Sequence, residues 1–266
     1  MTDVANKVVL ITGAGIGMGR LFAKRFANVS TSLILVDVND HALKNVSSEL
    51  KTVNYTYVCD ISDKKQVQEL VKKVHKDAGD VDIIINNAGV LYGYPFFRCT
   101  EDIIEKTIRV NVIGTMLITR AFLPDLMSKK RGHIINMASA SSLTGVPDLA
   151  VYASSKHAIE GFSESIRLEM KKYGFRDIYI TLVYPHFVNT GMVTGVKSSV
   201  LLSPEGVVNT VVKAIQKNRL YVYIPWWLRL MRILFYVMPT SFSDWLLFKT
   251  GVNRSMDEWI GHEQRR

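Results

Sequence analysis

The stretch "KVVLITGAGIGMG", residues 7–19, decides the fold, because it joins a short apolar run directly to a glycine-rich turn. The run is short enough for a buried parallel strand, and an amphipathic stretch of helix length follows the turn. Glycines at such a turn allow a tight bend, let a pyrophosphate approach the backbone and let the helix pack closely on the sheet. An ordinary turn between a strand and a helix is the plain alternative, but the flanking elements favour a dinucleotide site. The residues expected to line that site are Gly13, Gly15, Ile16, Gly17 and Gly19.

The rest of the chain repeats this alternation of strand and helix. Residues 63–76 place Val67, Leu70 and Val74 on one stripe with lysines opposite, which is typical of a helix laid on a sheet. Five further apolar runs of strand length lie at 32–36, 55–59, 81–85, 133–137 and 177–183. The pattern predicts an α/β fold: a doubly wound parallel sheet of the Rossmann type, flanked by helices, in a single domain. Ligands of such sheets bind outside the carboxyl ends of the strands.

Composition limits the class of protein further. The chain has 266 residues, of which 48% are hydrophobic, and no linker or repeat divides it. Its 33 Lys and Arg against 24 Asp and Glu give a net charge of +9, but the basic residues are scattered, so we expect no binding to nucleic acid. Cys59 and Cys99 are the only cysteines, which fits a reducing compartment and excludes a Cys-rich metal site. The segment after Met1 does not look like a secretion signal, so we expect an intracellular protein.

No metal site is expected from the histidines either. Five of the six show no ligand spacing and are interpreted as structural or solvent-facing: His41, His75, His133, His157 and His262.

A carboxylate at the end of the second predicted strand indicates which dinucleotide binds. Asp37 lies about twenty residues beyond the glycines, where it would accept hydrogen bonds from the adenosine ribose and repel a 2′-phosphate. Its neighbours Val38 and Asn39 are uncharged, and no Arg or Lys stands beside it in the sequence. NAD is therefore favoured over NADP. The alternative is that Asp37 only caps the end of the strand.

The remaining motifs arrive in a fixed order along the chain. They are "CDIS" at 59–62, "NNAG" at 86–89, "VNVIG" at 110–114, "NMASAS" at 136–141 and "YASSK" at 152–156. A Tyr with Lys four residues later also occurs by chance, but its conjunction with Ser139 and both glycine motifs is specific. In order and spacing, over residues 5–225, the chain resembles the short-chain dehydrogenase/reductase family. This resemblance implies an oxidoreductase that interconverts an alcohol and a carbonyl with NAD(P).

Chemistry explains why such an enzyme needs these residue types. A phenol with an ordinary pKa near 10 is a poor base at neutral pH. Tyr152 and Lys156, four apart on one predicted helix, share a face, so the ammonium can stabilise the phenolate. By the family's roles Tyr152 is the general acid/base, Lys156 also holds the nicotinamide ribose, Ser139 bonds the substrate oxygen and Asn111 holds a water that relays the proton. Singly, these residues could be a packed aromatic, a turn former and a buried polar side chain; jointly, the catalytic interpretation is favoured.

The resemblance also implies the rest of the cofactor site. Asp60 and Ile61 would border the adenine, followed by residues on the adenosine side and around the nicotinamide amide: Asn87, Ala88, Gly89, Pro185, Val188 and Thr190. The chain departs from the family pattern at His186, which replaces a glycine and puts an imidazole at the mouth of the active site. We expect His186 to contact substrate together with Ser139 and Tyr152.

The substitution at residue 186 and the "VNTGM" that follows resemble one membrane-associated branch of the family. That branch contains the epidermal-type retinol dehydrogenases and the 17β-hydroxysteroid dehydrogenases of lipid droplets. The resemblance implies an NAD-dependent enzyme for a lipophilic alcohol, at the endoplasmic reticulum or a lipid droplet, or otherwise in the cytoplasm. Two alternatives stay open: a general carbonyl reductase of small or xenobiotic ketones, and a dinucleotide-binding scaffold without turnover.

The C-terminal part begins with a strand and continues as a helix. Residues 220–224 alternate as in a last strand, and after Pro225 apolar residues recur at helical spacing until Pro239. The apolar residues of this helix are Leu230, Ile233, Leu234 and Val237, with Arg229 and Arg232 expected on another side. The charge-free run 233–243 is too short to span a bilayer, which takes about 20 residues.

Three interpretations of this segment remain. It could be an apolar lid over the substrate, a core or subunit contact, or a membrane-interface element at about 225–248 with Trp226, Trp227 and Tyr236 at headgroup depth. We expect a dehydrogenase domain over 1–225, with a substrate loop at about 186–203, and a C-terminal aromatic and basic helical extension over 226–266. The family resemblance implies a homo-oligomer that pairs through long helices at 101–128 and 150–173.

Overall fold

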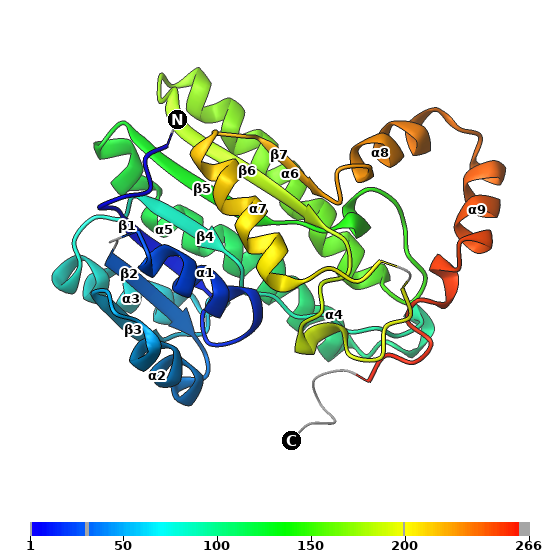
Figure 1. Cartoon of the computed structure of the whole chain (residues 1–266), viewed down its shortest axis with the longest axis horizontal. Helices are drawn as coiled ribbons and strands as arrows, with labels where there is room; N and C mark the ends of the chain where they lie inside the picture. The colour runs from blue at the N-terminus through cyan, green and yellow to red at the C-terminus, as the bar shows by residue number, and fades with distance from the viewer. Residues whose placement is uncertain (1, 30–31, 199, 261–266) are drawn as a thin grey trace.

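Seven parallel strands form one sheet in the computed structural model, which describes residues 2–29, 32–198 and 200–260 (Figure 1). The strands are β1 (Val8–Thr12), β2 (Ser32–Asp37), β3 (Asn54–Val58), β4 (Ile83–Asn86), β5 (Arg131–Met137), β6 (Asp177–Pro185) and β7 (Tyr221–Ile224). Their order is β3-β2-β1-β4-β5-β6-β7, so the direction of winding reverses between β1 and β4. This reversal is the switch point at which an open sheet binds ligands. All seven predicted strands are confirmed, with small shifts at their ends.

Helices cover both faces of the sheet. They are α1 (Gly17–Ala27), α2 (Asp40–Glu49), α3 (Lys64–Asp77), α4 (Glu101–Ile108), α5 (Thr115–Ser128), α6 (Ala150–Lys172), α7 (Pro204–Gln216), α8 (Leu228–Val237) and α9 (Thr240–Lys249). Because successive strand residues point to opposite faces, the core has two parts. Ile11 of β1 packs in one cluster with Phe22 and with residues of α2 and α7. Its neighbour Leu10 packs in the other with Phe122 and with residues of α3 and α6.

Local side chains fix where helices begin. The Asp63 carboxylate accepts hydrogen bonds from the backbone N–H groups of Lys65, at 2.7 Å, and Gln66, at 3.1 Å, so α3 begins at the next residue. Ser203 does the same for α7, where Pro204 occupies the first turn.

The helix predicted at 101–128 is one continuous helical run made of α4, a π-helical turn at Arg109–Gly114, and α5. By length and composition it is the one helix of the described residues that could cross a membrane, but half of its most apolar window is buried inside the protein. Ile118, Phe122 and Leu126 are fully buried against the sheet. Packing in the core therefore accounts for the apolar character of this run.

The C-terminal extension stands out from the domain as two short helices, shown in orange and red in Figure 1. The outer face of α8 carries Ile233, 57% exposed, and Val237, 73% exposed, so the interpretation of this segment as monomer core is wrong for that face. Arg232 was expected on another side of the helix than the apolar residues, and it does lie on the inner side, where it forms an ion pair with Glu160 of α6. The physical reason is that Tyr184 and Tyr223 also offer hydroxyl groups to the guanidinium on that side.

Candidate active site

The glycine-rich turn lies at the switch point between β1 and β4. Gly13 and Gly17 have φ values of 64° and 54°, the left-handed region that favours glycine. A Cβ added at Gly13 would lie 2.8 Å from the Ala88 Cα, and one added at Gly19 would collide with the Gly13 carbonyl oxygen. The turn therefore needs its glycines, and it places the N-terminus of α1 at the carboxyl end of β1, where a phosphate is favoured.

Asp37 has a structural role as well as the predicted one. Its carboxylate accepts a hydrogen bond from Gly15 N at 2.9 Å and another from Asn39 N at 3.0 Å, which ties the glycine turn to the end of β2. Each carboxylate oxygen keeps a second lone pair for a ribose hydroxyl. The strand-end cap and the ribose contact are therefore compatible.

The sequence did not reveal a cation near this site. Arg20 of α1 lines the same cavity as Gly15 and Asn39, although it is far from Asp37 in the sequence. Its guanidinium is paired with the Glu49 carboxylate through Nε at 3.2 Å and Nη2 at 2.5 Å. The only sequence feature that could have predicted this placement of Arg20 is its position one helical turn after Ile16.

The loop after β4 is fastened to the glycine turn. Thr12 Oγ1 accepts hydrogen bonds from the N–H groups of Asn87 and Ala88, both at 3.1 Å, and Asn87 Nδ2 donates to the carbonyl oxygens of Thr12 and Gly13. Thr12 was not predicted, because its role depends on a segment 75 residues away. Gly89 also lines the cavity that Ser139, Tyr152 and Lys156 surround. The residues expected on the adenosine side thus lie beside the turn.

The residues expected at the adenine and at the nicotinamide lie in two different places in the structure. Asp60 Oδ1 accepts from the Ser62 N–H and hydroxyl within its own turn, and Ile61 is buried under Gly114. Their contact with adenine stays a prediction. Pro185, Val188 and Thr190 all line the cavity that Ser139, Tyr152 and Lys156 surround, and their contact with the nicotinamide amide also stays a prediction.

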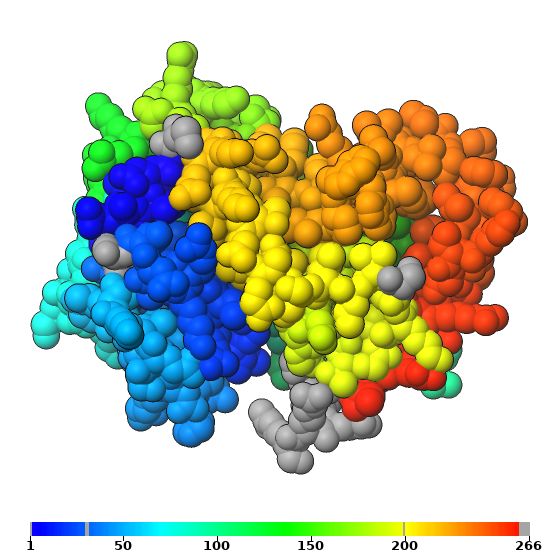
Figure 2. All heavy atoms as spheres, in the orientation of Figure 1, coloured from blue at the N-terminus to red at the C-terminus, as the bar shows by residue number. Residues whose placement is uncertain are grey.

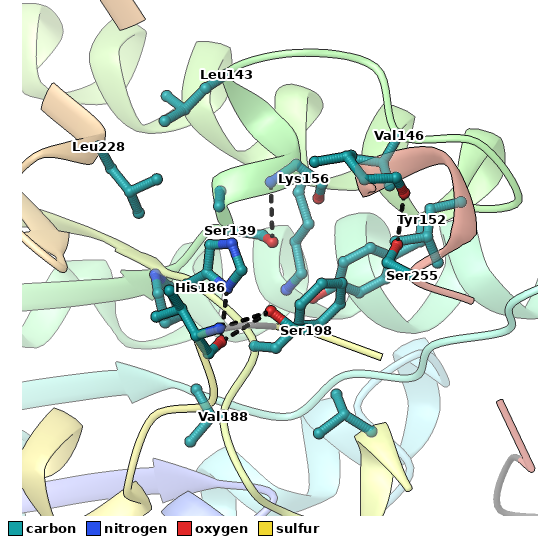
Figure 3. A pocket seen from close by; sticks show the side chains of 18 of the residues that line it. Ser139, Leu143, Val146, Tyr152, Lys156, His186, Val188, Ser198, Leu228 and Ser255 are labelled. Carbon is teal, nitrogen blue, oxygen red and sulfur yellow. Dashed lines mark hydrogen bonds between the residues drawn. The ribbon is translucent and has the colours of Figure 1, made fainter. Parts of the chain in front are cut away.

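Ser139, Tyr152 and Lys156 surround one cavity (Figure 3). Tyr152 and Lys156 come from the first two turns of α6, and the Lys156 Nζ lies 5.6 Å from the centre of the Tyr152 ring and donates to the Met137 carbonyl at 2.8 Å. Ser139 follows β5 and begins a short 3₁₀ turn, accepting from Ser141 N at 3.1 Å. The spacing in the sequence thus predicted three side chains that two separate elements bring together.

Burial sets the protonation of this group. It raises the pKa of Tyr152 to about 12, against a smaller lowering by the Ser139 hydroxyl, and it lowers the pKa of Lys156 to about 8. At neutral pH the phenol is therefore protonated until a further positive charge enters the site.

Asn111 is fully engaged with neighbouring segments. It lies in the π-helical turn and is 1% exposed; its Oδ1 accepts from Val90 N at 2.8 Å, and its Nδ2 donates to Val90 O at 2.9 Å and Ser155 Oγ at 3.0 Å. These bonds hold the loop after β4 against α6, the helix that carries Tyr152 and Lys156. The water relay expected at Asn111 stays a prediction.

The cavity has a volume of about 520 Å³ and a mostly apolar lining, which suits a small organic molecule oriented by a few polar groups. The extension supplies one wall through Met231, Phe235, Leu246 and Leu247. The sequence did not identify these residues as a wall, because both faces of α8 are apolar and α9 was not predicted.

His186 lies in this cavity, as expected from the sequence (Figure 3). Its Nδ1 donates to the Val200 carbonyl at 3.1 Å, and its ring packs edge-on against Phe187 at 5.1 Å between centroids. Burial lowers the pKa of the imidazole. A neutral ring held in this way can contact substrate and is a poor proton donor at neutral pH.

The histidine that lies close to two carboxylates, His75, is outside the cavity of the candidate active site. Within residues 2–29, 32–198 and 200–260, the one cluster with metal-ligand geometry is His75, Asp80 and Asp125. Asp125 already accepts from His75 Nε2 at 3.0 Å and Val81 N at 2.9 Å, so it fastens the segment before β4, at the amino edge of the sheet. His133 is buried, His41 and His157 are exposed, and His262 lies outside the described residues.

A doubly wound sheet with a glycine-rich turn at its switch point, and Ser139, Tyr152 and Lys156 around one apolar cavity, define an oxidoreductase that acts on CH–OH groups with NAD(P). The family model described as short chain dehydrogenase matches residues 7–200. The chain belongs to this family, and the resemblance stated from its motifs is confirmed.

Two relatives match almost the whole chain. Estradiol 17-beta-dehydrogenase 11 of Rattus norvegicus is 35% identical, over 99% of this chain and 89% of its own length. Epidermal retinol dehydrogenase 2 of Homo sapiens is 34% identical, over 99% and 88%. The resemblance to this branch of the family is therefore confirmed.

Solved structures agree with the fold. A short chain dehydrogenase/reductase from Burkholderia phymatum in complex with NAD has a TM-score of 0.78 at 27% identity, over 84% of this chain and 90% of that one. A metagenomic short-chain oxidoreductase in complex with NADP has a TM-score of 0.71 at 25% identity, over 84% and 96%. These neighbours support binding of NAD(P) and leave the choice between the two dinucleotides to the residues of this chain.

Proposed function

We propose that the protein interconverts a lipophilic alcohol and its carbonyl, of the retinol or 17β-hydroxysteroid type, with NAD. The observation that carries this proposal is the apolar cavity, which extends from Ser139 and Tyr152 to the inner side of the extension. Its volume of about 520 Å³ suits a molecule of that size. The two relatives named for estradiol and retinol support the same class of substrate.

Four side chains carry the chemistry in this proposal: Ser139, Tyr152, Lys156 and Asn111. When bound, the dinucleotide exchanges a hydride with the carbinol carbon. The alcohol loses its hydroxyl proton to the Tyr152 oxygen, and the Ser139 hydroxyl donates a hydrogen bond to the same substrate oxygen. The Lys156 ammonium, on the same face of α6, stabilises the phenolate and holds the nicotinamide ribose. Asn111 fixes the loop beside them and holds the relaying water.

The rate of NADH formation tests this function. We expect turnover with all-trans-retinol or estradiol, higher with lipid vesicles present, and little with short secondary alcohols. Activity on short alcohols and ketones alone would replace the proposal with a general carbonyl reductase.

For the cofactor we propose NAD. Two carboxylates disfavour the 2′-phosphate of NADP, one by repelling it and the other by pairing with a nearby cation. Asp37 is the proposed ribose ligand. Glu49 pairs with Arg20, the cation that lines the same cavity, and also with Lys24, so Arg20 is already engaged by a carboxylate. Comparing the dissociation constants of NAD and NADP tests this choice. Equal or tighter binding of NADP would contradict it.

The extension, residues 226–266, is proposed to touch a membrane or lipid-droplet surface, which places the protein at an intracellular membrane. In Figure 2 its helices α8 and α9, in orange and red, form a lobe at the right of the molecule, beside the substrate loop at about 186–203. The extension exposes aromatic and aliphatic residues of kinds that suit the interface of a bilayer. They are Trp226, Leu230, Ile233, Leu234, Tyr236, Val237, Phe242, Trp245 and Phe248. Flotation of the protein with liposomes tests the contact.

A homodimer through the helical run 101–128 and α6 is proposed from the family resemblance. Leu168 of α6 is 55% exposed and Ile113 of the π-helical turn is 40% exposed, so apolar side chains are available on both helices. Sedimentation velocity of the purified protein tests the oligomeric state, and a monomer at micromolar concentration would contradict it.

A further inference from the structure

The last described residues of the chain return to the catalytic domain. After α9 and a short turn, residues 255–260 run alongside the substrate loop, and Figure 1 shows this red segment beside the yellow one. Ser255 O accepts from Lys197 N at 2.9 Å, and Ile260 N donates to Thr194 O at 3.1 Å. Between them, Trp259 Nε1 donates to Met192 O at 3.0 Å. Three hydrogen bonds therefore fasten this tail to residues 192–197.

The other side of the tail meets the loop after β4. Trp259 packs edge-on against Tyr94, with 5.6 Å between ring centroids. A Cβ added at Gly93 would collide with the end of the Met256 side chain, and one added at Gly195 would collide with the Glu258 carbonyl oxygen. The tail therefore lies between two loops, and at Gly195 it leaves no room for a side chain, because the clash there is with backbone.

The tail also reaches the catalytic side chains. Met256, 4% exposed, forms a buried cluster with Leu91 and Leu149, and Tyr152 and Trp259 pack against this cluster. The Lys197 ammonium lies 2.5 Å from a Glu258 carboxylate oxygen, but both side chains are more than half exposed, so this pair adds little. The hydrogen bonds and aromatic packing of Trp259 carry the attachment.

We propose that the tail 255–260 holds the substrate loop closed from within the same chain, and that Trp259 is the positioning residue that anchors it. Loops at binding sites open at a small free-energy cost, so a loop fastened in this way needs less ordering when substrate binds. With the loop fixed, the apolar body of a substrate whose carbinol lies at Tyr152 is directed toward Met231 and Phe235. This role rests on the proposed function insofar as it concerns substrate affinity.

Two variants and a control isolate the anchor. Trp259→Ala removes both the hydrogen bond and the ring, Trp259→Phe keeps the ring, and Trp226→Ala removes a 72% exposed tryptophan of the same extension. The direct measurement is trypsin cleavage after Lys197 with NAD present, followed by mass spectrometry. We expect cleavage in Trp259→Ala to be about tenfold faster, an intermediate rate in Trp259→Phe, and no change in Trp226→Ala.

Steady-state kinetics provide the second measurement. For any alcohol that the wild type oxidises and whose body fills the apolar cavity, we expect Trp259→Ala to raise KM by about tenfold while kcat and the dissociation constant of NAD stay within about twofold. An unchanged cleavage rate at Lys197 would overturn the proposal. Equal acceleration at every tryptic site would also overturn it, because Trp259 would then stabilise the whole fold rather than the loop. The cleavage arm needs no substrate, so it decides this role even if lipophilic alcohols prove not to be substrates.

Discussion

Burial shifts the pKa values of both Tyr152 and Lys156. Burial raises the pKa of the Tyr152 phenol to about 12 and lowers the pKa of the Lys156 ammonium to about 8, so burial favours the neutral form of each group. The ammonium nevertheless lies 5.6 Å from the centre of the phenol ring, where its charge favours the phenolate. Tyr152 therefore becomes a base at neutral pH only when a further positive charge enters the cavity and lowers the pKa of its phenol.

Removal of the Tyr152 hydroxyl separates catalysis from binding. Tyr152→Phe keeps the ring and loses the proton acceptor, so we expect the turnover number to fall by about a thousandfold. The dissociation constant of NAD, measured by fluorescence titration, should change by less than about threefold, because the glycine turn is untouched. Wild-type turnover in this variant would show that Tyr152 is not the reacting group, whereas a wild type without turnover that still binds NAD would favour the scaffold.

The pH dependence of alcohol oxidation follows from the same two groups. Below its raised pKa, the phenolate fraction of Tyr152 grows about tenfold per pH unit, so the oxidation rate should rise from about pH 6. Above about pH 8 the Lys156 ammonium loses its proton and its stabilising charge, so the rise should flatten. Initial rates of alcohol oxidation with saturating NAD measure this. Carbonyl reduction with saturating NADH should change little with pH below the raised pKa of about 12, because the phenol that it needs stays protonated there. A flat profile for oxidation would show that another step limits turnover.

At the scale of the element, α8 shows where prediction from sequence stops. Apolar spacing predicted the helix, and the observed span, Leu228–Val237, agrees with it. Spacing could not identify the inner face, because Leu228, Met231 and Phe235 are as apolar as the outer residues. The inward turn of Arg232 depends on Glu160, 72 residues away in the sequence, and no local pattern reveals such a partner.

The Arg232–Glu160 ion pair is the polar attachment of α8 to the catalytic helix α6. The two side chains are 24% and 12% exposed, so Arg232→Met leaves a largely buried carboxylate without its cation. We expect the free energy of unfolding, measured by urea denaturation, to fall by about 3 kcal/mol. Replacing Glu160 by Met as well should restore much of this loss, since no unpaired charge then remains.

The matched control is an ion pair on the surface. Lys72 and Glu69 are 71% and 59% exposed, so Lys72→Met should change the free energy of unfolding by less than about 0.5 kcal/mol. If the double variant at Arg232 and Glu160 were as destabilised as the sum of the two single variants, the ion pair would not be what fastens α8.

At the scale of the whole molecule, contacts between distant segments separate the predictable part of the site from the rest. The glycine motifs, Ser139 and the Tyr152–Lys156 spacing can be recognised from residues close together in the sequence. They therefore allowed the sheet and the proposed catalytic residues to be predicted. Thr12, Arg20 and Trp259 act through partners on other elements, and the substrate cavity is closed by two parts of the extension. Nothing in the sequence around such residues marks them as part of the site, because their partners come close only in the folded chain.

The proposed membrane contact belongs to the scale of the whole molecule, because it would combine the apolar outer face of α8 with a net charge of +9. We expect the wild type to float with liposomes that contain anionic lipid, and less so at high salt, since basic residues such as Arg229 and Lys249 add a screened attraction. Ile233→Glu with Val237→Glu places two carboxylates on the face that would enter the interface. The bound fraction should fall by about tenfold or more, because apolar burial is lost and like charge is added.

The control for this experiment is Val53→Glu. Val53 is 58% exposed, close to the 57% of Ile233, but it precedes β3 at the far edge of the sheet from the extension. It should float like the wild type, and all three proteins should oxidise the same alcohols in the absence of vesicles. A wild type that does not float, together with loss of a dimer in the double variant, would instead assign the outer face of α8 to a second copy of the chain. Flotation of the double variant at the wild-type level would show that membrane binding resides outside this face.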